Sequence, residues 1–327
     1  MRGKIRWGIL GPGKIAQKFA EDLIQVSEAQ LTAVASRNLQ RAQEFANTYQ
    51  VENVFDSYDS LFSSDVVDVI YIATPHTFHK ELSIRAMRAG KHILCEKPLG
   101  INVREVAAMI SVAKENNVFL MEALWSRFNP TIRRIKEITE NGTIGELKYI
   151  NADFAFYAMD RPKESRLFNL DLAGGSILDI GIYPVFLAYL LLGKPKRIES
   201  ISNFNENGTE IQTSVIFQYK NAQAILSSSL GNDSRMSAEV SGTKGSITLE
   251  PRFHETDGYC LKTHDIVENI ELPKVGNGYT HEIMEVNKCL EENKLESSLW
   301  SHKNSLELIM LLDEIREKGG VRFPFEN

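Results

Sequence analysis

Short apolar runs alternate with stretches of helical periodicity from the N-terminus up to Met121. Apolar runs of this kind, separated by helix patterns, are typical of strands in a parallel sheet that is covered on both faces. We therefore predict βαβ units that form a doubly wound sheet. The expected strands are 4–10, 31–35, 67–73, 92–95 and 118–121, and the expected helices are 17–24, 38–49, 78–89 and 103–115.

The pattern changes beyond Trp125, where short strand patterns follow one another with turn signals and no helix between them. Such a series predicts an antiparallel sheet. We predict an α/β protein with an N-terminal Rossmann domain over 1–122 and a C-terminal α+β domain over 123–327, the latter with a mostly antiparallel open sheet that binds substrate and mediates oligomerisation. The expected helices are 130–141, 176–192, 280–292 and 303–318, and the expected strands are 147–157, 197–204, 211–219, 223–229, 236–241, 246–249 and 259–263.

Composition excludes several function classes. The chain has 327 residues, enough for two domains, and its net charge is -6 with no basic block, which disfavours nucleic acid as a partner. Apolar runs such as 183–192 are too short to cross a bilayer, so we expect a cytoplasmic protein with no membrane partner. The cysteines, at 95, 260 and 289, show neither a disulfide framework nor zinc-ligand spacing, and we predict no metal.

The first strand ends in Gly11-Pro12-Gly13-Lys14-Ile15-Ala16 and passes directly into a helix pattern. Gly-x-Gly-x-x-Ala between a strand and a helix is the context of a dinucleotide fingerprint. Gly11 permits a tight turn, Gly13 lets the backbone approach a pyrophosphate, and Ala16 lets the helix pack on the strand. Residues 11, 13, 14, 15 and 16 are therefore predicted to bind cofactor.

The end of the second strand indicates which cofactor is preferred. An acidic residue there accepts hydrogen bonds from the ribose of NAD, but this chain has Ser36-Arg37-Asn38, with Arg41 four residues after Arg37. A hydroxyl and two guanidinium groups suit a 2′-phosphate. We predict NADP, with NAD as the alternative; two arginines that merely cover a solvated helix start would leave the choice open.

Polar residues follow two further strands at the edge where ligands bind in such sheets. The first group runs Ala73-Thr74-Pro75-His76-Thr77-Phe78-His79, and no third ligand accompanies its histidines to suggest a metal. The second is Glu96-Lys97-Pro98, where a cis Lys97–Pro98 bond would fix the direction of a lysine beside the nicotinamide ribose and a substrate hydroxyl. We assign residues 73–76, 79, 96 and 97 to the cofactor site.

Four motifs occur in a fixed order: Gly-x-Gly-x-x-Ala from 11, Ala-Thr-Pro-x-x-x-His at 73–79, Glu-Lys-Pro at 96–98 and Ala-Gly-Gly-x-x-x-Asp-x-Gly-x-Tyr at 173–183. Together they resemble the Gfo/Idh/MocA oxidoreductase family. Within it, the stretches 121–128 and 179–183 are most similar to the branch of dimeric dihydrodiol dehydrogenase and NADP-dependent D-xylose dehydrogenase.

The resemblance implies a cofactor held at the junction of two domains and a catalytic or substrate-orienting role for Lys97. Many members use a histidine as proton carrier, but here the matching motif ends in Tyr183, as in the dihydrodiol branch. Asp179 lies one helical turn earlier and is expected to position Lys97 or a substrate hydroxyl. Trp125 and Arg127 join the expected cofactor and substrate contacts; other members keep a tryptophan–arginine pair where this chain reads Arg166-Leu167-Phe168.

The reaction that these residues suggest is reversible hydride transfer between a nicotinamide and a hydroxyl-bearing carbon of a sugar, polyol or cyclic trans-diol. An unperturbed phenol has a pKa near 10, so Tyr183 needs adjacent positive charge to act as a base, and Lys97 and the oxidised nicotinamide supply it. The alternatives are a non-catalytic NAD(P)-sensing protein of the same fold and a transhydrogenating oxidoreductase with tightly held nucleotide. Because an open antiparallel sheet needs its second face covered, we expect a homodimer or higher homo-oligomer through that sheet.

Overall fold

The computed structural model describes residues 3–264 and 266–326, and their contacts divide the chain into two compact units. The first unit consists of Met1–Phe128 together with Val275–Leu306, and the second of Asn129–Lys274 together with Glu307–Asn327. Each unit therefore contains two separate segments of the chain, and each is described by itself below.

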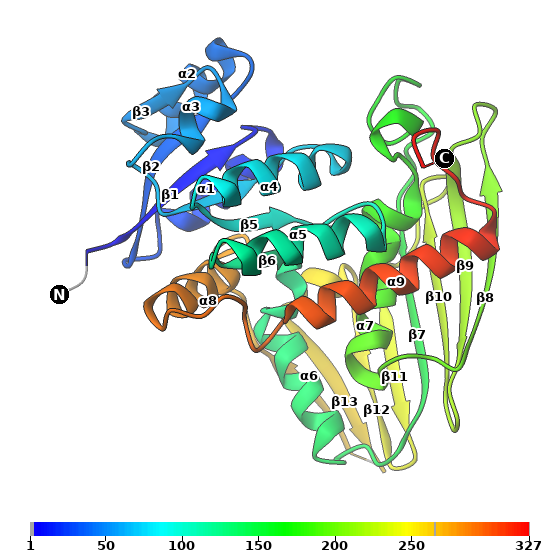
Figure 1. Ribbon diagram of the computed structural model, residues 1–327. Helices are drawn as coiled ribbons and strands as arrows, with labels where there is room; N and C mark the ends of the chain where they lie inside the picture. The colour runs from blue at the N-terminus through cyan, green and yellow to red at the C-terminus, as the bar shows by residue number, and fades with distance from the viewer. Residues whose placement is uncertain (1–2, 265, 327) are drawn as a thin grey trace. The chain divides into compact units, whose positions relative to one another are not determined.

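The first unit is built on a six-stranded parallel sheet with the strand order β3-β2-β1-β4-β5-β6 (Figure 1). The chain runs outward from β1 to β3 and then returns to β4 on the other side of β1, so the strand order reverses between β1 and β4, where such sheets bind ligands. All four residues of β4 are buried, as the sequence pattern predicts for a strand covered on both faces. The strands are β1 (Ile5–Leu10), β2 (Ala29–Ala35), β3 (Asn53–Phe55), β4 (Val69–Ile72), β5 (His92–Glu96) and β6 (Leu120–Ala123).

The helices of this unit begin where the sequence supplies a cap. Asn38 accepts a hydrogen bond from the amide of Arg41 at the start of α2, and Asn102 does the same for Glu105 at the start of α5. The helices are α1 (Lys14–Leu23), α2 (Leu39–Tyr49), α3 (Tyr58–Phe62), α4 (His79–Arg88), α5 (Val103–Glu115) and α8 (Thr280–Glu291).

The second unit is built on an eight-stranded sheet with the order β14-β13-β12-β11-β7-β10-β9-β8. Neighbouring strands are antiparallel except β7 and β10, which are parallel, so the predicted fold class of a parallel sheet plus a mostly antiparallel one is confirmed. The strands are β7 (Leu147–Ala155), β8 (Arg197–Phe204), β9 (Glu210–Gln218), β10 (Gln223–Ser229), β11 (Ala238–Gly242), β12 (Gly245–Leu249), β13 (Gly258–Thr263) and β14 (Ile266–Glu271).

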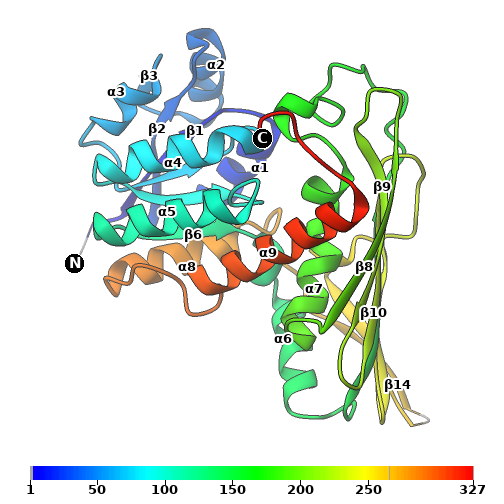
Figure 2. The ribbon, with the colours of Figure 1, turned by 45° about the vertical axis from the view of Figure 1, so that its right-hand side comes forward.

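Helices α6 (Pro130–Glu140), α7 (Ile182–Leu192) and the part of α9 (His302–Gly319) beyond residue 306 lie along one face of this sheet (Figure 2). Within the described part of this unit, no helix covers the opposite face. That face carries apolar side chains: Ile201 is 76% exposed, Ile216 47% and Ile225 43%.

The structure corrects three expectations. The predicted single helix over 176–192 begins as a π-helix over Ile177–Gly181 and becomes α7 only at Ile182. The short elements β3, α3 and β14 are not predicted, because three to six residues show no clear periodicity. The apolar run 183–192 is too short to span a membrane, but the helical stretch that contains it, Leu170–Leu192, is long and apolar enough to do so. In the structure 83% of the most apolar window of this stretch is buried, as in the core helix of a globular domain.

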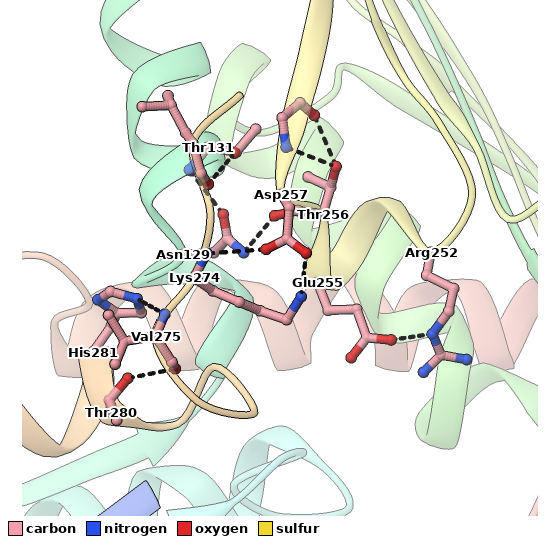
Figure 3. A network of polar contacts seen from close by, with 12 residues as sticks. Asn129, Thr131, Arg252, Glu255, Thr256, Asp257, Lys274, Val275, Thr280 and His281 are labelled. Atoms are coloured by element: carbon pink, nitrogen blue, oxygen red, sulfur yellow. Dashed lines mark hydrogen bonds and ion pairs between the residues drawn. The ribbon is translucent and has the colours of Figure 1, made fainter. Parts of the chain in front are cut away.

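A polar network fixes the turn that joins β12 to β13 and the start of α6 (Figure 3). The amide group of Asn129 donates to the carbonyl of Thr256 at 2.9 Å, while its oxygen accepts from the amide of Thr131 at 2.8 Å. Lys274 holds Asp257 through both its backbone amide and its ammonium group. The short helical turn Phe253–Glu255, which carries His254, is thereby tied to its surroundings.

Candidate active site

The glycine loop after β1 has the geometry that its sequence predicts. Gly11 adopts φ +87, and a Cβ built there would lie 3.0 Å from the carbonyl oxygen of Ala73, so only glycine fits without strain. Gly13 is the N-cap of α1, and a Cβ built there would meet nothing within 4 Å. The loop therefore leaves open space at a helix N-terminus, the arrangement that binds the phosphates of a dinucleotide.

This loop lines a cavity of about 440 Å³ together with residues from the ends of β2 and β4. The switch point of the sheet therefore brings three separate sequence motifs to one pocket. The predicted cofactor residues that line it are Gly11, Gly13, Ser36, Arg37, Arg41, Ala73, Thr74 and Pro75.

The side chains of Ser36 and Arg37, directly after β2, line the pocket and are held by neighbouring residues. The hydroxyl of Ser36 accepts from the amide of Asn38 at 3.1 Å, and Arg37 stands over the ring of Phe78 with 5.4 Å between the guanidinium carbon and the ring centroid. Glu81 also lines the pocket, but it pairs with Arg85 at 2.7 Å. The two arginines and the absence of a carboxylate directly after β2 fit the nucleotide phosphate that the sequence predicts.

The other residues of the first turn do not line this pocket. Ile15 is 42% exposed, whereas Ala16 is fully buried and packs α1 onto the sheet, as predicted. Lys14 opens the helix. Thr74, after β4, lines the pocket, and its hydroxyl oxygen is buried with no hydrogen-bond partner among the described residues.

His79 connects the turns that follow β4 and β5. Its Nε2 lies 2.8 Å from the carbonyl oxygen of Thr74, and its Nδ1 lies 2.9 Å from the carbonyl oxygen of Pro98. Burial lowers the pKa of this imidazole, with Lys97 adding to the effect and the two carbonyl groups opposing it. A neutral imidazole has one N–H and donates to one of the two oxygens, so only the charged form satisfies both. His76 lies beside it, with ring centroids 5.8 Å apart.

The Glu96-Lys97-Pro98 turn is held at its backbone, and the Lys97–Pro98 peptide is cis. Glu96 accepts from the phenol of Tyr71 and, at 3.2 Å, from the amide of Lys97. Burial raises the pKa of Tyr71 well above its ordinary value, so this phenol stays a hydrogen-bond donor. One position further on, the amide of Leu99 donates to the buried carboxyl of Glu122 at 2.9 Å. The turn that carries Lys97 is thus held by Tyr71 of β4, Glu122 of β6 and His79 of α4.

Two further predicted residues lie after β6. Trp125 stacks on Tyr279, with centroids 4.7 Å apart and 8° between the rings. Arg127 is buried, and its Nε donates to the carbonyl of Leu299 at 2.8 Å.

In the second unit, Asp179 and Tyr183 lie on the continuous helix formed by the π-helix and α7. The two terminal nitrogens of the Arg166 guanidinium donate to the two carboxylate oxygens of Asp179, each at 3.2 Å. The Tyr183 ring packs against Phe154, with centroids 5.6 Å apart, and against His254, at 4.8 Å. Arg166 therefore contributes to this cluster, although its motif departs from the expected tryptophan–arginine pair.

His254 and Glu210 are functional candidates that the sequence does not indicate. His254 is buried and stacks on Phe154 with centroids 4.4 Å apart, which places an imidazole beside Tyr183. It lies in a short turn without a motif, and only the general enrichment of histidine at active sites could have drawn attention to it. Glu210 is nearly fully buried, although its position after Asn207-Gly208-Thr209 is that of a solvated turn.

Within residues 3–264 and 266–326, no group of three or more His, Cys, Asp or Glu side chains is placed to hold a metal ion. Cys95 is fully buried, and burial raises the pKa of its thiol well above the ordinary value, which disfavours a nucleophilic role.

Two family models match consecutive parts of the chain. Residues 5–124 match the oxidoreductase family with an NAD-binding Rossmann fold, and residues 132–248 match the Gfo/Idh/MocA C-terminal domain. The chain belongs to the Gfo/Idh/MocA oxidoreductase family. It is therefore an NAD(P)-dependent oxidoreductase, as its motifs predict.

This family member matches its relatives over nearly its full length. It is 35% identical to a trans-1,2-dihydrobenzene-1,2-diol dehydrogenase from Mus musculus over 98% of both chains. It is 32% identical, again over 98% of both, to an NADP(+)-dependent scyllo-inositol 2-dehydrogenase from Bacillus subtilis. Among solved structures, a 3-ketoreductase from Actinomadura kijaniata in complex with NADP and TDP-benzene is 26% identical with a TM-score of 0.87, covering 97% of this chain and 98% of the ketoreductase.

Proposed function

We propose that this protein catalyses the reversible, NADP-dependent oxidation of a secondary or anomeric alcohol of a sugar, polyol or cyclic trans-diol. The observation that carries the proposal is the cavity in which the glycine loop of Gly11 and Gly13 meets Ser36, Arg37 and Arg41. An anion-binding loop and a pair of guanidinium groups in one cavity match the two phosphate positions of NADP.

The residues present fit this cofactor. Gly13 lines the cavity, and a Cβ there would meet nothing within 4 Å, so the loop leaves open space where a phosphate would lie. Gly11, Gly13 and the first turn of α1 would hold the pyrophosphate, while Ser36, Arg37 and Arg41 would hold the 2′-phosphate. When bound, the nicotinamide supplies the hydride acceptor for alcohol oxidation and the donor for the reverse reaction.

The substrate class is supported by the names of the relatives. They comprise a dehydrogenase of a cyclic trans-diol, a dehydrogenase of inositol and a ketoreductase crystallised with a TDP-linked compound. The names describe dehydrogenation of an alcohol or reduction of a ketone, which are the two directions of one interconversion. We infer the same chemistry for this chain, with the individual substrate set by side chains around Tyr183.

We assign the proton transfer to Tyr183 and the orientation of the substrate hydroxyl to Lys97. Further structures of the Actinomadura ketoreductase carry single substitutions of a lysine or of a tyrosine, which supports a role for these two residue types. In this assignment the Tyr183 phenolate takes the hydroxyl proton during oxidation and becomes the phenol, which returns the proton in the reverse reaction. The positive charge of Lys97 is assigned the stabilisation of the phenolate before the transfer.

Asp179 is assigned the orientation of a second substrate hydroxyl. Its carboxylate is 10% exposed and is held by Arg166, so it is pre-positioned to accept a hydrogen bond. Trp125 and Arg127 are assigned to the surroundings of the cofactor, where the stacked pair of Trp125 and Tyr279 offers a flat apolar wall.

In functional terms we propose a dinucleotide-binding domain over 1–122 and a substrate-binding and oligomerisation domain over 123–327, in a cytoplasmic protein. We further propose a homodimer or higher homo-oligomer in which the exposed face of the eight-stranded sheet covers its counterpart. Ile201, Ile216 and Ile225 support this, because exposed apolar residues gathered on one sheet face mark an interaction surface.

The test is a panel of polyols, aldoses and cyclic trans-diols mixed with purified protein and either NADP or NAD, followed at the nicotinamide absorbance. The expected result is reduction of NADP with at least one member, at a higher kcat/KM than with NAD. Tight NADP binding without turnover on any member would contradict the proposal and indicate a sensor instead.

A further inference from the structure

The helix that carries Asp179 and Tyr183 begins in an unusual way. Its first five residues, Ile177–Gly181, form a π-helix, a geometry that is rare and occurs mostly at functional sites. The first amides of any helix lack partners within the helix and need acceptors from elsewhere. Here the residue at the N-cap, Ser176, makes no side-chain capping bond to the helix amides.

A distant carboxylate supplies those acceptors. Glu210, at the first position of β9, accepts from the amide of Ser176 at 2.7 Å and from the amide of Ile177 at 3.0 Å, both through Oε2. Its Oε1 accepts from the hydroxyl of Ser176 at 2.6 Å and from that of Thr213 at 2.7 Å. Four donors therefore converge on two oxygens, which is the pattern of a fully satisfied carboxylate.

The site is buried and closely fitted. Glu210 is 1% exposed and Ser176 is fully buried. The hydroxyl of Ser176 also contacts that of Ser228 on β10 at 2.7 Å, so the helix start is tied to two strands. Gly175 has φ +134, and a Cβ there would lie 3.0 Å from Oε2 of Glu210, which explains why the Ala-Gly-Gly motif needs glycine at this position.

This arrangement has a direct consequence for Asp179 and Tyr183, which follow Ser176 by three and seven residues on the same helix. The amides of Ser176 and Ile177 and the hydroxyl of Ser176 are all held by Glu210. The helix therefore cannot rotate or slide along the sheet without breaking several buried hydrogen bonds. We propose that Glu210 is a positioning residue for the reaction, fixing the start of this helix and thereby the directions of the Asp179 carboxylate and the Tyr183 phenol.

This inference rests on the proposed function and acts through Tyr183 rather than through direct contact with substrate. Burial raises the pKa of Glu210, while its four hydrogen-bond donors oppose the shift. A negative charge at a helix N-terminus is also favoured by the helix dipole. An amide in place of the carboxylate keeps the shape but loses acceptor capacity and charge, which makes Glu210→Gln a sharp probe.

The experiment compares wild type, Glu210→Gln and a control, Glu326→Gln, which changes the partly buried partner of the buried Arg316 elsewhere in the same unit. For Glu210→Gln we expect kcat to fall about tenfold to a hundredfold, as for a misplaced catalytic group, with the NADP Kd changed less than about twofold. We also expect the acidic limb of the kcat/KM profile for alcohol oxidation to move, because Tyr183 must be deprotonated to act as the base and its surroundings change. The control should lose stability without moving that limb.

A second pair of variants covers the case in which Glu210→Gln does not fold. Thr213→Val and Ser176→Ala each remove one hydroxyl donor and leave the carboxylate in place; each should lower kcat less than Glu210→Gln and move the same limb. Unchanged kcat and pH profile in the folded variants would overturn the inference. Failure of the proposed function is recognised separately, because wild type would then show no turnover with any substrate.

Discussion

Arg166 holds Asp179 with both ends of its guanidinium group, Nη1 to Oδ1 and Nη2 to Oδ2, each at 3.2 Å. The side chain of Arg166 is 51% exposed, whereas that of Asp179 is 10% exposed. A paired contact of this kind fixes the plane of the carboxylate as well as its position. The loop before the Ala-Gly-Gly motif therefore takes part in arranging the helix that carries Tyr183.

Replacing Arg166 with Gln is expected to lower kcat/KM about tenfold, since a charge-assisted hydrogen bond contributes about 1.5–3 kcal/mol and the carboxylate would lose its orientation. The free energy of unfolding should change by less than about 1 kcal/mol, because the arginine is half exposed. The matched control is Lys163→Gln. Lys163 lies in the same loop as Arg166, and the substitution removes its exposed ion pair with Glu206. Equal effects of the two variants on kcat/KM would argue against a specific role for the Arg166 pair.

The two arginines after β2 should determine cofactor choice. Arg37→Ala and Arg41→Ala are each expected to raise the Kd for NADP about tenfold or more, because each removes a charged donor from a phosphate. The Kd for NAD should stay within about threefold, since NAD has an uncharged hydroxyl in place of the phosphate at that position. Arg88→Ala, an exposed arginine of α4 outside the cavity, serves as the control. A parallel loss of both cofactors would contradict the assignment.

Glu282 predicts a pH dependence of stability. Its carboxyl is fully buried, and neither oxygen has a hydrogen-bond partner among the described residues. Burial, aided by the nearby Glu96 and Asp22, raises its pKa well above the ordinary value. The unfolded chain releases this proton above about pH 4.3, whereas the folded chain keeps it, so stability falls as pH rises from there toward the folded pKa.

Replacing Glu282 with Gln should therefore flatten the decline in the free energy of unfolding between about pH 5 and pH 8. Glu282→Met should raise stability at neutral pH by about 1–3 kcal/mol, because it removes a buried polar group without partners. Denaturant unfolding at several pH values measures both effects, with Glu291→Gln, an exposed acid on the same helix, as the control. A wild-type slope that persists in Glu282→Gln would show that another group causes it.

The exposed sheet face should be where two copies of the chain meet. Ile216 on β9 lies directly opposite Ile225 on β10, so a charge at either position would fall within the apolar surface. Ile216→Lys is expected to convert the oligomer to a monomer in light scattering, while Ile24→Lys, at an exposed position of the first unit, leaves it unchanged. A wild-type protein that is monomeric would remove the basis for this surface.

The sequence predicts most of the Rossmann unit because its strands and its motif glycines obey local rules. Gly11 needs a positive φ and Ala16 needs to be small, and both requirements follow from a strand–turn–helix pattern. Contacts between distant segments could not be predicted in this way. Tyr71 and Glu96 lie 25 residues apart, and nothing in either motif indicates their hydrogen bond.

The second unit was less accessible to sequence reasoning. Its strands follow from alternation, but the parallel pairing of β7 and β10 depends on the strand order in the sheet, which no local pattern records. His254 joins Tyr183 only through the fold of a short turn, and Glu210 reaches the helix start across 34 residues. Residues of this kind are found from geometry rather than from motifs.

The measurement that tests the central claim most directly is the kinetics of Tyr183→Phe together with its affinity for NADP. The variant keeps the ring that packs on Phe154 and His254 and loses only the hydroxyl. We predict that kcat falls by about a hundredfold or more, as for a general acid–base residue, while the Kd for NADP changes less than about twofold. Turnover at the wild-type rate in a protein that binds NADP normally would contradict the account.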